Sequence, residues 1–234
     1  MARILRSARG AVNVSLDYGM VSIDDLAHLQ QVRQLELYTL ELVGSPASSS
    51  LSLPSLRSLH LFVVSISPSA THLLTPSSLP QLRHLQLWSS PVTVDSLIPQ
   101  LHAISFQPIA HHSLSGARSV QLLHFHYPSD KTDTVLSQLP SLPPFISIDF
   151  GAHYSQERFA QVIDGLEQLL ASPKKGLRVI LLREMRIDDA GEAVIEGLEG
   201  RAIRVVWERR SLNFDGAILA MEGFGGGEAS STGR

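Results

Sequence analysis

The chain has 234 residues, of which 44% are hydrophobic and 18% charged, a composition typical of a folded globular protein. Its 19 basic and 22 acidic residues give a formal net charge of −3, which argues against a nucleic-acid or membrane-surface partner. Cysteine is absent, so disulfides and thiolate metal sites are excluded, and a reducing cytoplasmic or nuclear location is expected. No apolar run approaches the ~20 residues of a membrane helix.

Apolar periodicity predicts strands that alternate with helical or coiled returns along the whole chain. Eight strands are expected, at residues 12–17, 32–40, 56–66, 85–87, 119–125, 145–150, 177–182 and 203–207. Short helices are expected after Ser22, from Pro68 and from Thr93 through Ile104, and longer ones at 130–139, 156–170 and 188–198. The Ser- and Pro-rich stretch 44–55 is expected to be a coiled return.

A short pattern occurs twice near the centre of the chain. Leu53–Leu61 and Leu79–Leu87 both read L-P-x-L-R-x-L-x-L, and looser copies occupy Leu29–Leu37 and Leu114–Leu122. Leu35, Leu59 and Leu85 hold equivalent places, so successive units are expected to stack with these leucines side by side. The longer step from Leu85 to Val120 indicates an insertion or a degenerate copy.

This L-x-x-L-x-L frame, with one strand and one return per unit, resembles the leucine-rich repeat. The resemblance implies an α/β solenoid with a curved parallel sheet and helical or coiled returns over residues 11–210. Residues 1–10 are expected to be a flexible basic N-terminus, and the Gly- and Ser-rich residues 211–234 a mostly disordered tail. The family has an Asn or Cys three residues after the last leucine. The residues found there are Leu40, Val64, Ser90 and Phe125, so the usual hydrogen-bonding column is expected to be missing.

The irregular, asparagine-poor repeats are similar to the ribonuclease-inhibitor-like repeats of fungal F-box-associated proteins. In that family the repeats recruit a substrate, and an N-terminal F-box binds the Skp adaptor of a ubiquitin ligase. The resemblance therefore implies a non-catalytic protein–protein interaction module whose partner is a ubiquitin-ligase substrate. Only ten residues precede the first predicted strand, so an F-box does not fit there and the recognition half alone is expected.

Three large rings, Tyr38, Phe62 and Trp88, follow the inner leucine of successive units. Alternation places them on the outward side of the sheet, where aromatic side chains supply much of the binding energy of protein interfaces. The rival interpretation is that the strands end there and the rings fold back over the core. The predicted partner-binding surface consists of Glu36, Tyr38, His60, Phe62, Gln86, Trp88 and Gln121.

One arginine recurs at the same position of each copy. These residues are Arg33, Arg57, Arg83 and Arg118, with Arg178 and Arg204 similarly placed near later strands. Stacked, they would form a basic ridge that binds an acidic peptide or a phosphate. The simpler interpretation is a solvated row at the strand entrances, balanced by nearby Asp and Glu.

No G-x-S-x-G, G-x-x-x-x-G-K-[ST] or H-E-x-x-H motif occurs, so neither catalysis nor a cofactor is expected. His124 and His126 share a strand without a visible third ligand, so no metal site is expected. Eight β-α units also suit an α/β barrel enzyme with groups such as Asp149 and His153 at its strand ends. The alternating strands favour the open arrangement, because barrel strands are apolar on both faces. A decayed repeat fragment without a partner is the third alternative.

Overall fold

The structure is a computed structural model that describes residues 5, 8, 10–44, 51–90, 92–106, 114–126, 142–149, 176–183, 189–200, 203–208 and 213–227. It is an α/β fold in which the described strand pairs are all parallel. The chain divides into two compact units. Unit 1 comprises Met1–His102 and Ile109–Ser119, and unit 2 comprises Ala103–Pro108 and Val120–Arg234.

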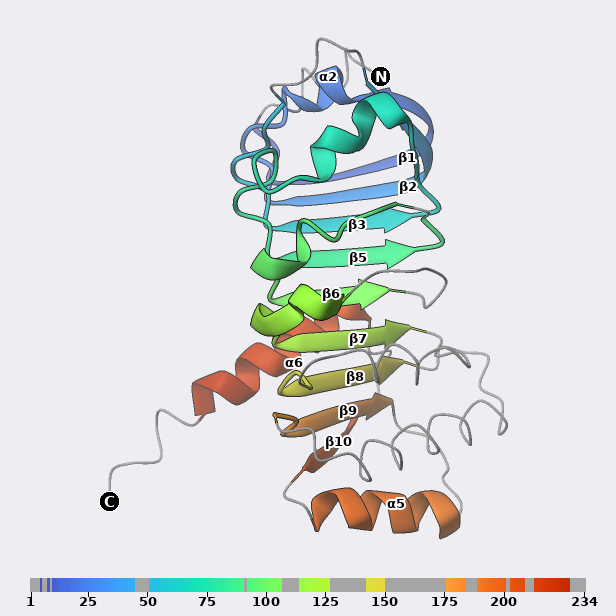
Figure 1. Ribbon diagram of the computed structural model, residues 1–234, viewed down its shortest axis with the longest axis vertical. Coiled ribbons are helices and arrows are strands. Elements are labelled where there is room, and N and C mark those ends of the chain that lie inside the picture. Colours follow the sequence, from blue (N-terminus) through green and yellow to red (C-terminus); the bar gives the residue numbers. More distant parts are fainter. Residues whose placement is uncertain are drawn as a thin grey trace. The chain divides into compact units, whose positions relative to one another are not determined.

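The described strands of unit 1 form one parallel sheet (Figure 1). They are β1 (Asn13–Ser22), β2 (Gln34–Val43), β3 (Ser58–Phe62), β4 (Ser65–Ile66) and β5 (His84–Trp88), in the order β1-β2-β3-β5 with β4 beside β2. Leu35 lies opposite Leu59, and Leu59 lies opposite Leu85. The leucines that hold equivalent places in the sequence pattern are therefore neighbours in the sheet, as predicted.

The returns of unit 1 are short. Helix α2 (Ile23–Leu26) begins after Ser22, whose hydroxyl accepts a hydrogen bond from the backbone N–H of Asp24 at 3.3 Å. The 3-10 helix η1 (Pro68–Leu74) starts on proline and buries leucine against the sheet, as its sequence predicts. Residues 51–55 contain no helix or strand, which agrees with a coiled return. The expected flexible N-terminus contains Leu5, whose side chain is buried.

The prediction of a helix from Thr93 through Ile104 is wrong. Only the 3-10 helix η2 (Ile98–Gln100) forms there, and Ile104 lies in a strand. Its apolar residues have helical spacing, but that spacing also fits one tight turn followed by a strand, and Pro99 interrupts a longer helix. Arg118 lies in a further 3-10 helix, η3 (Leu114–Ser119).

The described strands of unit 2 also pair in chain order. They are β6 (Ala103–Phe106), β7 (Leu122–His126), β8 (Phe145–Asp149), β9 (Val179–Arg183) and β10 (Arg204–Glu208). Strand β6 was not predicted from the sequence, and its presence explains the long step after Leu85. Ile146 of β8 lies opposite Leu123 of β7. Helix α5 (Asp189–Glu199) forms where a helix was predicted, whereas the helices expected at 130–139 and 156–170 lie outside the described residues.

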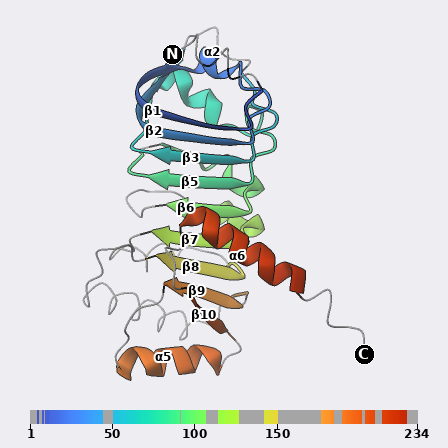
Figure 2. The same cartoon turned by 180° about the vertical axis from the view of Figure 1, so that it is seen from behind.

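Helix α6 (Phe214–Gly227) lies across the sheet of unit 2 (Figure 2). Phe214 is 1% exposed, and it shares a core cluster with other apolar residues of the helix and of the sheet. The cluster contains Ala103, Leu122, Val179, Leu181, Phe214, Ala217 and Ile218. Much of the segment expected to be a disordered tail is thus a packed helix. Burial of its apolar residues against the sheet stabilises this helix. The local sequence does not show that such a sheet face is available.

The strand order is an open path, and in neither unit do the first and last described strands pair. The described strands therefore form no closed barrel, which contradicts the α/β-barrel alternative. Within the part of the chain that the structure describes, no helix is both long and apolar enough to cross a membrane.

Candidate binding surface

A left-handed residue interrupts the strands of unit 1 at equivalent positions. These residues are Tyr18, Thr39, Val63 and Ser89, with φ angles of 56°, 48°, 56° and 46°. Each of the last three directly follows one of the predicted aromatic residues. A left-handed backbone costs about 1–2 kcal/mol for a residue other than glycine, so its recurrence across neighbouring strands marks a geometry that the fold imposes.

The left-handed residue shifts the alternation of the strand by one position. Leu37 and Leu40 are both buried although they are three residues apart, because Thr39 turns the chain between them. Val64 and Ser90 are buried in the same way after Val63 and Ser89. The positions where the leucine-rich repeat carries Asn or Cys therefore do point into the interior.

Ser90 makes the kind of contacts that the sequence analysis expected to be missing. Its Oγ accepts a hydrogen bond from the backbone N–H of Val64 at 3.0 Å and lies 3.2 Å from the carbonyl oxygen of Leu61 and 3.0 Å from that of Trp88. Leu40 and Val64 instead contribute apolar side chains to the core. A hydrogen-bonding side chain of the kind expected to be absent is therefore present at one place, Ser90.

Tyr38, Phe62 and Trp88 lie side by side in register on β2, β3 and β5. The rings of Tyr38 and Phe62 are stacked, with centroids 4.6 Å apart and planes 6° from parallel. The rings of Phe62 and Trp88 are 6.3 Å apart and tilted by 36°. All three are half-buried. We call these three residues the aromatic column.

The aromatic column lies on the side of the sheet that carries Glu36. The hydroxyl of Tyr38 donates a hydrogen bond to Oε2 of Glu36 at 3.2 Å, and Nε2 of Gln34 donates to Oε1 at 3.0 Å. Leu35 and Leu37 are buried on the opposite side. Of the two placements that the sequence left open, the structure therefore has the rings on the outward side of the strands.

Two residues of the predicted surface are less accessible than expected. His60 is only 3% exposed; its Nε2 lies 2.9 Å from Oγ of Ser58, and its ring packs edge-on with the ring of Phe62. Gln86, which lies opposite His60, is also buried. On a central strand both neighbours crowd a side chain, so alternation alone does not give accessibility. Ser58, His60 and Glu36 form a polar row, but Nδ1 of His60 and Oε1 of Glu36 are 3.8 Å apart, too far for a hydrogen bond.

Gln121 is exposed and lies outside unit 1. It belongs to unit 2 and directly precedes β7, and its carbonyl oxygen accepts a hydrogen bond from the backbone N–H of Phe145. In unit 2 the side of the sheet that carries His124 packs against α6, and it holds the buried polar residues Ser105 and Ser147 beside apolar ones. The His124 ring lies 5.8 Å from the Phe214 ring, and its Nδ1 is 3.0 Å from Oγ of Ser147. The side chain of His126 lies outside the described residues.

Three of the four predicted ridge arginines are stacked at the strand entrances of unit 1. The backbone N–H of Arg57 donates to the carbonyl of Arg33 at 2.8 Å, and that of Arg83 donates to the carbonyl of Arg57 at 2.9 Å. The next residue in this series is His102, whose N–H donates to the carbonyl of Arg83 at 2.7 Å. Arg118 was expected in that place but lies in η3. We call Arg33, Arg57 and Arg83 the arginine column.

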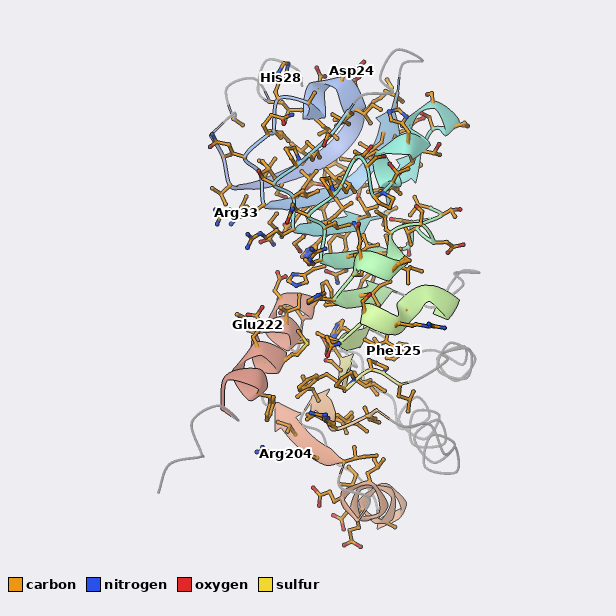
Figure 3. The ribbon with its side chains drawn as sticks, turned by 60° about the vertical axis from the view of Figure 1, so that its left-hand side comes forward. Asp24, His28, Arg33, Phe125, Arg204 and Glu222 are labelled. Carbon is orange, nitrogen blue, oxygen red and sulfur yellow. The ribbon has the colours of Figure 1, made fainter. Side chains whose placement is uncertain are left out.

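In unit 2 the backbone N–H of Arg204 likewise donates to the carbonyl of Arg178, at 2.8 Å. His102 was not predicted to join this series, because the strand β6 that follows it was not predicted. Arg33 points away from the ribbon in Figure 3.

No protein-family model matches the chain, and no curated protein matches it. The leucine-rich-repeat resemblance therefore rests on the sequence pattern, and its functional implications are part of the proposal that follows.

Proposed function

We propose that this protein is a non-catalytic, leucine-rich-repeat-like module that binds a protein partner through the outward side of β2, β3 and β5. The aromatic column is the observation that carries the proposal. Its three rings come from three separate units of the sequence, yet they stand in one row on the side of the sheet opposite the buried leucines.

The contacts of the column suit binding. The side chains of stacked rings are already ordered. A partner that packs on them therefore costs little additional side-chain entropy. Half-buried aromatic residues offer large apolar area beside polar groups, here Glu36 and the hydroxyl of Tyr38, and this mixture is typical of interface hot spots.

The resemblance to F-box-associated repeats extends the proposal to the kind of partner. In this extended form the partner is a ubiquitin-ligase substrate, and the F-box is supplied by another polypeptide or another part of the protein. The extension is tested by asking whether a partner captured by the chain is also ubiquitylated in cells, and whether its level rises when the chain is removed.

Affinity capture from a native extract, followed by quantitative mass spectrometry, tests the binding surface itself. The parent chain is compared with a variant carrying Tyr38→Ala, Phe62→Ala and Trp88→Ala. A matched control carries Met20→Ala, because Met20 is an exposed apolar side chain of β1 outside the column. We expect the same partner with the parent and the control, and its loss with the triple variant.

Thermal unfolding followed by circular dichroism accompanies this comparison. If the triple variant is unfolded at the temperature of capture, the rings are core residues and the interface proposal is wrong. If the folded triple variant captures the partner as well as the parent does, another surface binds it. Enrichment of nothing by the parent would support the decayed-fragment alternative.

A further inference from the structure

The arginine column is a charged feature that the proposed function does not use. The hydrogen bonds from Arg57 to Arg33 and from Arg83 to Arg57 fix the three backbones in successive strands. Neighbouring strands are about 4.8 Å apart, so the three Cα atoms extend over roughly 10 Å. The three arginine side chains therefore begin at backbone positions that form one short row.

Among the residues that the structure describes, no acidic side chain forms an ion pair with this row. Arg33 and Arg57 are exposed, and within the described residues neither guanidinium has a hydrogen bond or an ion pair. Arg83 is half-buried, and its Nη1 donates to the carbonyl oxygens of Leu82 at 3.3 Å and Gln100 at 3.4 Å. The simpler interpretation of the pattern, a row balanced by nearby Asp and Glu, therefore lacks the ion pairs it requires in this part of the chain.

We propose that Arg33, Arg57 and Arg83 form a binding site for an extended acidic peptide, whose carboxylate or phosphate oxygens accept hydrogen bonds from the guanidinium groups. Arg83 is held in place by its two carbonyl contacts and anchors the site. Arg33 and Arg57 are free to move onto the ligand, and each can engage an oxyanion through two parallel N–H groups.

The dimensions of the row fit a peptide. Side chains on one side of an extended peptide repeat about every 6.7 Å, which is twice the rise per residue of a strand. Arginine side chains that repel one another splay apart from a backbone spacing of about 4.8 Å, and so approach that repeat. Acidic residues at alternate positions of the peptide would then meet successive arginines.

A peptide is favoured over a nucleic acid by charge. A duplex presents a phosphate every ~1.7 Å along its axis and is usually bound by an extended basic surface. The row here is short, and the chain as a whole carries a formal net charge of −3. The site lies at the strand entrances, whereas the aromatic column lies five residues further along the strands, so the two proposals are independent.

Fluorescence polarisation of the full chain with labelled peptides tests the inference. The probes are a peptide that alternates Glu with Ser, the same peptide with phosphoserine in place of Glu, and a neutral peptide with Gln. We expect both acidic probes to bind and the neutral one not to bind. Comparing the two acidic probes distinguishes a carboxylate from a phosphate ligand.

The decisive variant carries Arg33→Gln and Arg57→Gln, whose exposed side chains make no hydrogen bond or ion pair with the described residues. We expect its Kd for the better acidic probe to rise at least tenfold. Arg118→Gln is the control, because it makes the same kind of substitution, with the loss of one positive charge, at an exposed arginine outside the column, and it should change Kd less than twofold. The triple variant of the aromatic column should bind the probe like the parent, so failure of one proposal is distinguishable from failure of the other.

The inference is overturned if the double variant, shown to be folded by circular dichroism, binds like the parent, or if Arg118→Gln weakens binding equally. Equal binding of the Gln peptide would also overturn it. Displacement of the peptide by a short DNA duplex at lower concentration would replace the acidic peptide with a nucleic acid as the ligand.

Discussion

The hydroxyl of Ser90 accepts a hydrogen bond from the backbone N–H of Val64 at 3.0 Å, which joins the ends of two neighbouring strands. Val64 is buried, so its N–H has no access to water and depends on this acceptor. One small side chain thus supports the backbone at the point where the strands leave the sheet.

Ser90→Ala is expected to destabilise the protein by about 1–3 kcal/mol, because it leaves the buried N–H of Val64 without its acceptor. Urea unfolding followed by tryptophan fluorescence measures the change. Ser65→Ala is the control, since Ser65 is exposed on β4, and it should alter stability by less than about 0.5 kcal/mol. Equal stability of the Ser90 variant and the parent would mean that water or another group replaces the hydroxyl.

Val63→Asn is expected to stabilise the protein by about 1 kcal/mol. Val63 has a φ of 56°, which is costly for a β-branched residue and much less so for Asn. Its side chain is 51% exposed, so little apolar burial is lost. Thermal unfolding checks the prediction, with Met20→Asn as an exposed control whose φ is not positive. A lower melting temperature for Val63→Asn would show that the valine side chain packs more than its exposure indicates.

Leu85→Ala is expected to cost about 2–5 kcal/mol, because Leu85 is fully buried opposite Leu59 and its truncation leaves a cavity between adjacent strands. Leu85→Met keeps the side-chain volume and should cost less than about 1.5 kcal/mol. Urea midpoints of the two variants and the parent give the comparison. If the alanine variant unfolds at the midpoint of the parent, the leucine is not a core anchor.

Phe214→Ala is expected to cost about 3–5 kcal/mol in unit 2 and to expose the apolar side of its sheet. Increased binding of a hydrophobic dye and hydrogen exchange in β7 and β9 would report this. Leu219→Ala is the control on the same helix, because that side chain is 68% exposed. Unchanged exchange in the Phe214 variant would mean that α6 contributes little to the unit.

Prediction from sequence was most accurate where the spacing of apolar residues and the repeated sequence pattern indicated the same structure. Leu35, Leu59 and Leu85 lie side by side because their spacing and the repeated letters around them specify the same register. Prediction was wrong between Leu97 and Ile104, where apolar spacing fits a helix and a turn-plus-strand equally well. The accuracy of the predictions for the binding surface varied in the same way. The aromatic column was predicted from periodicity, whereas Arg118 was misplaced and His102 missed because β6 was not recognised.

The sequence by itself determined the parallel leucine strands of unit 1, the alignment of Tyr38, Phe62 and Trp88 on neighbouring strands, and the stacking of Arg33, Arg57 and Arg83. These depend on alternation and on a repeated pattern, which are properties of neighbouring residues. Only the tertiary structure decided that His60 is buried, that Ser90 bonds to Val64, and that α6 packs on a sheet. Each of these depends on groups far apart in the chain, whose approach is set by packing and hydrogen bonding and leaves no local signal.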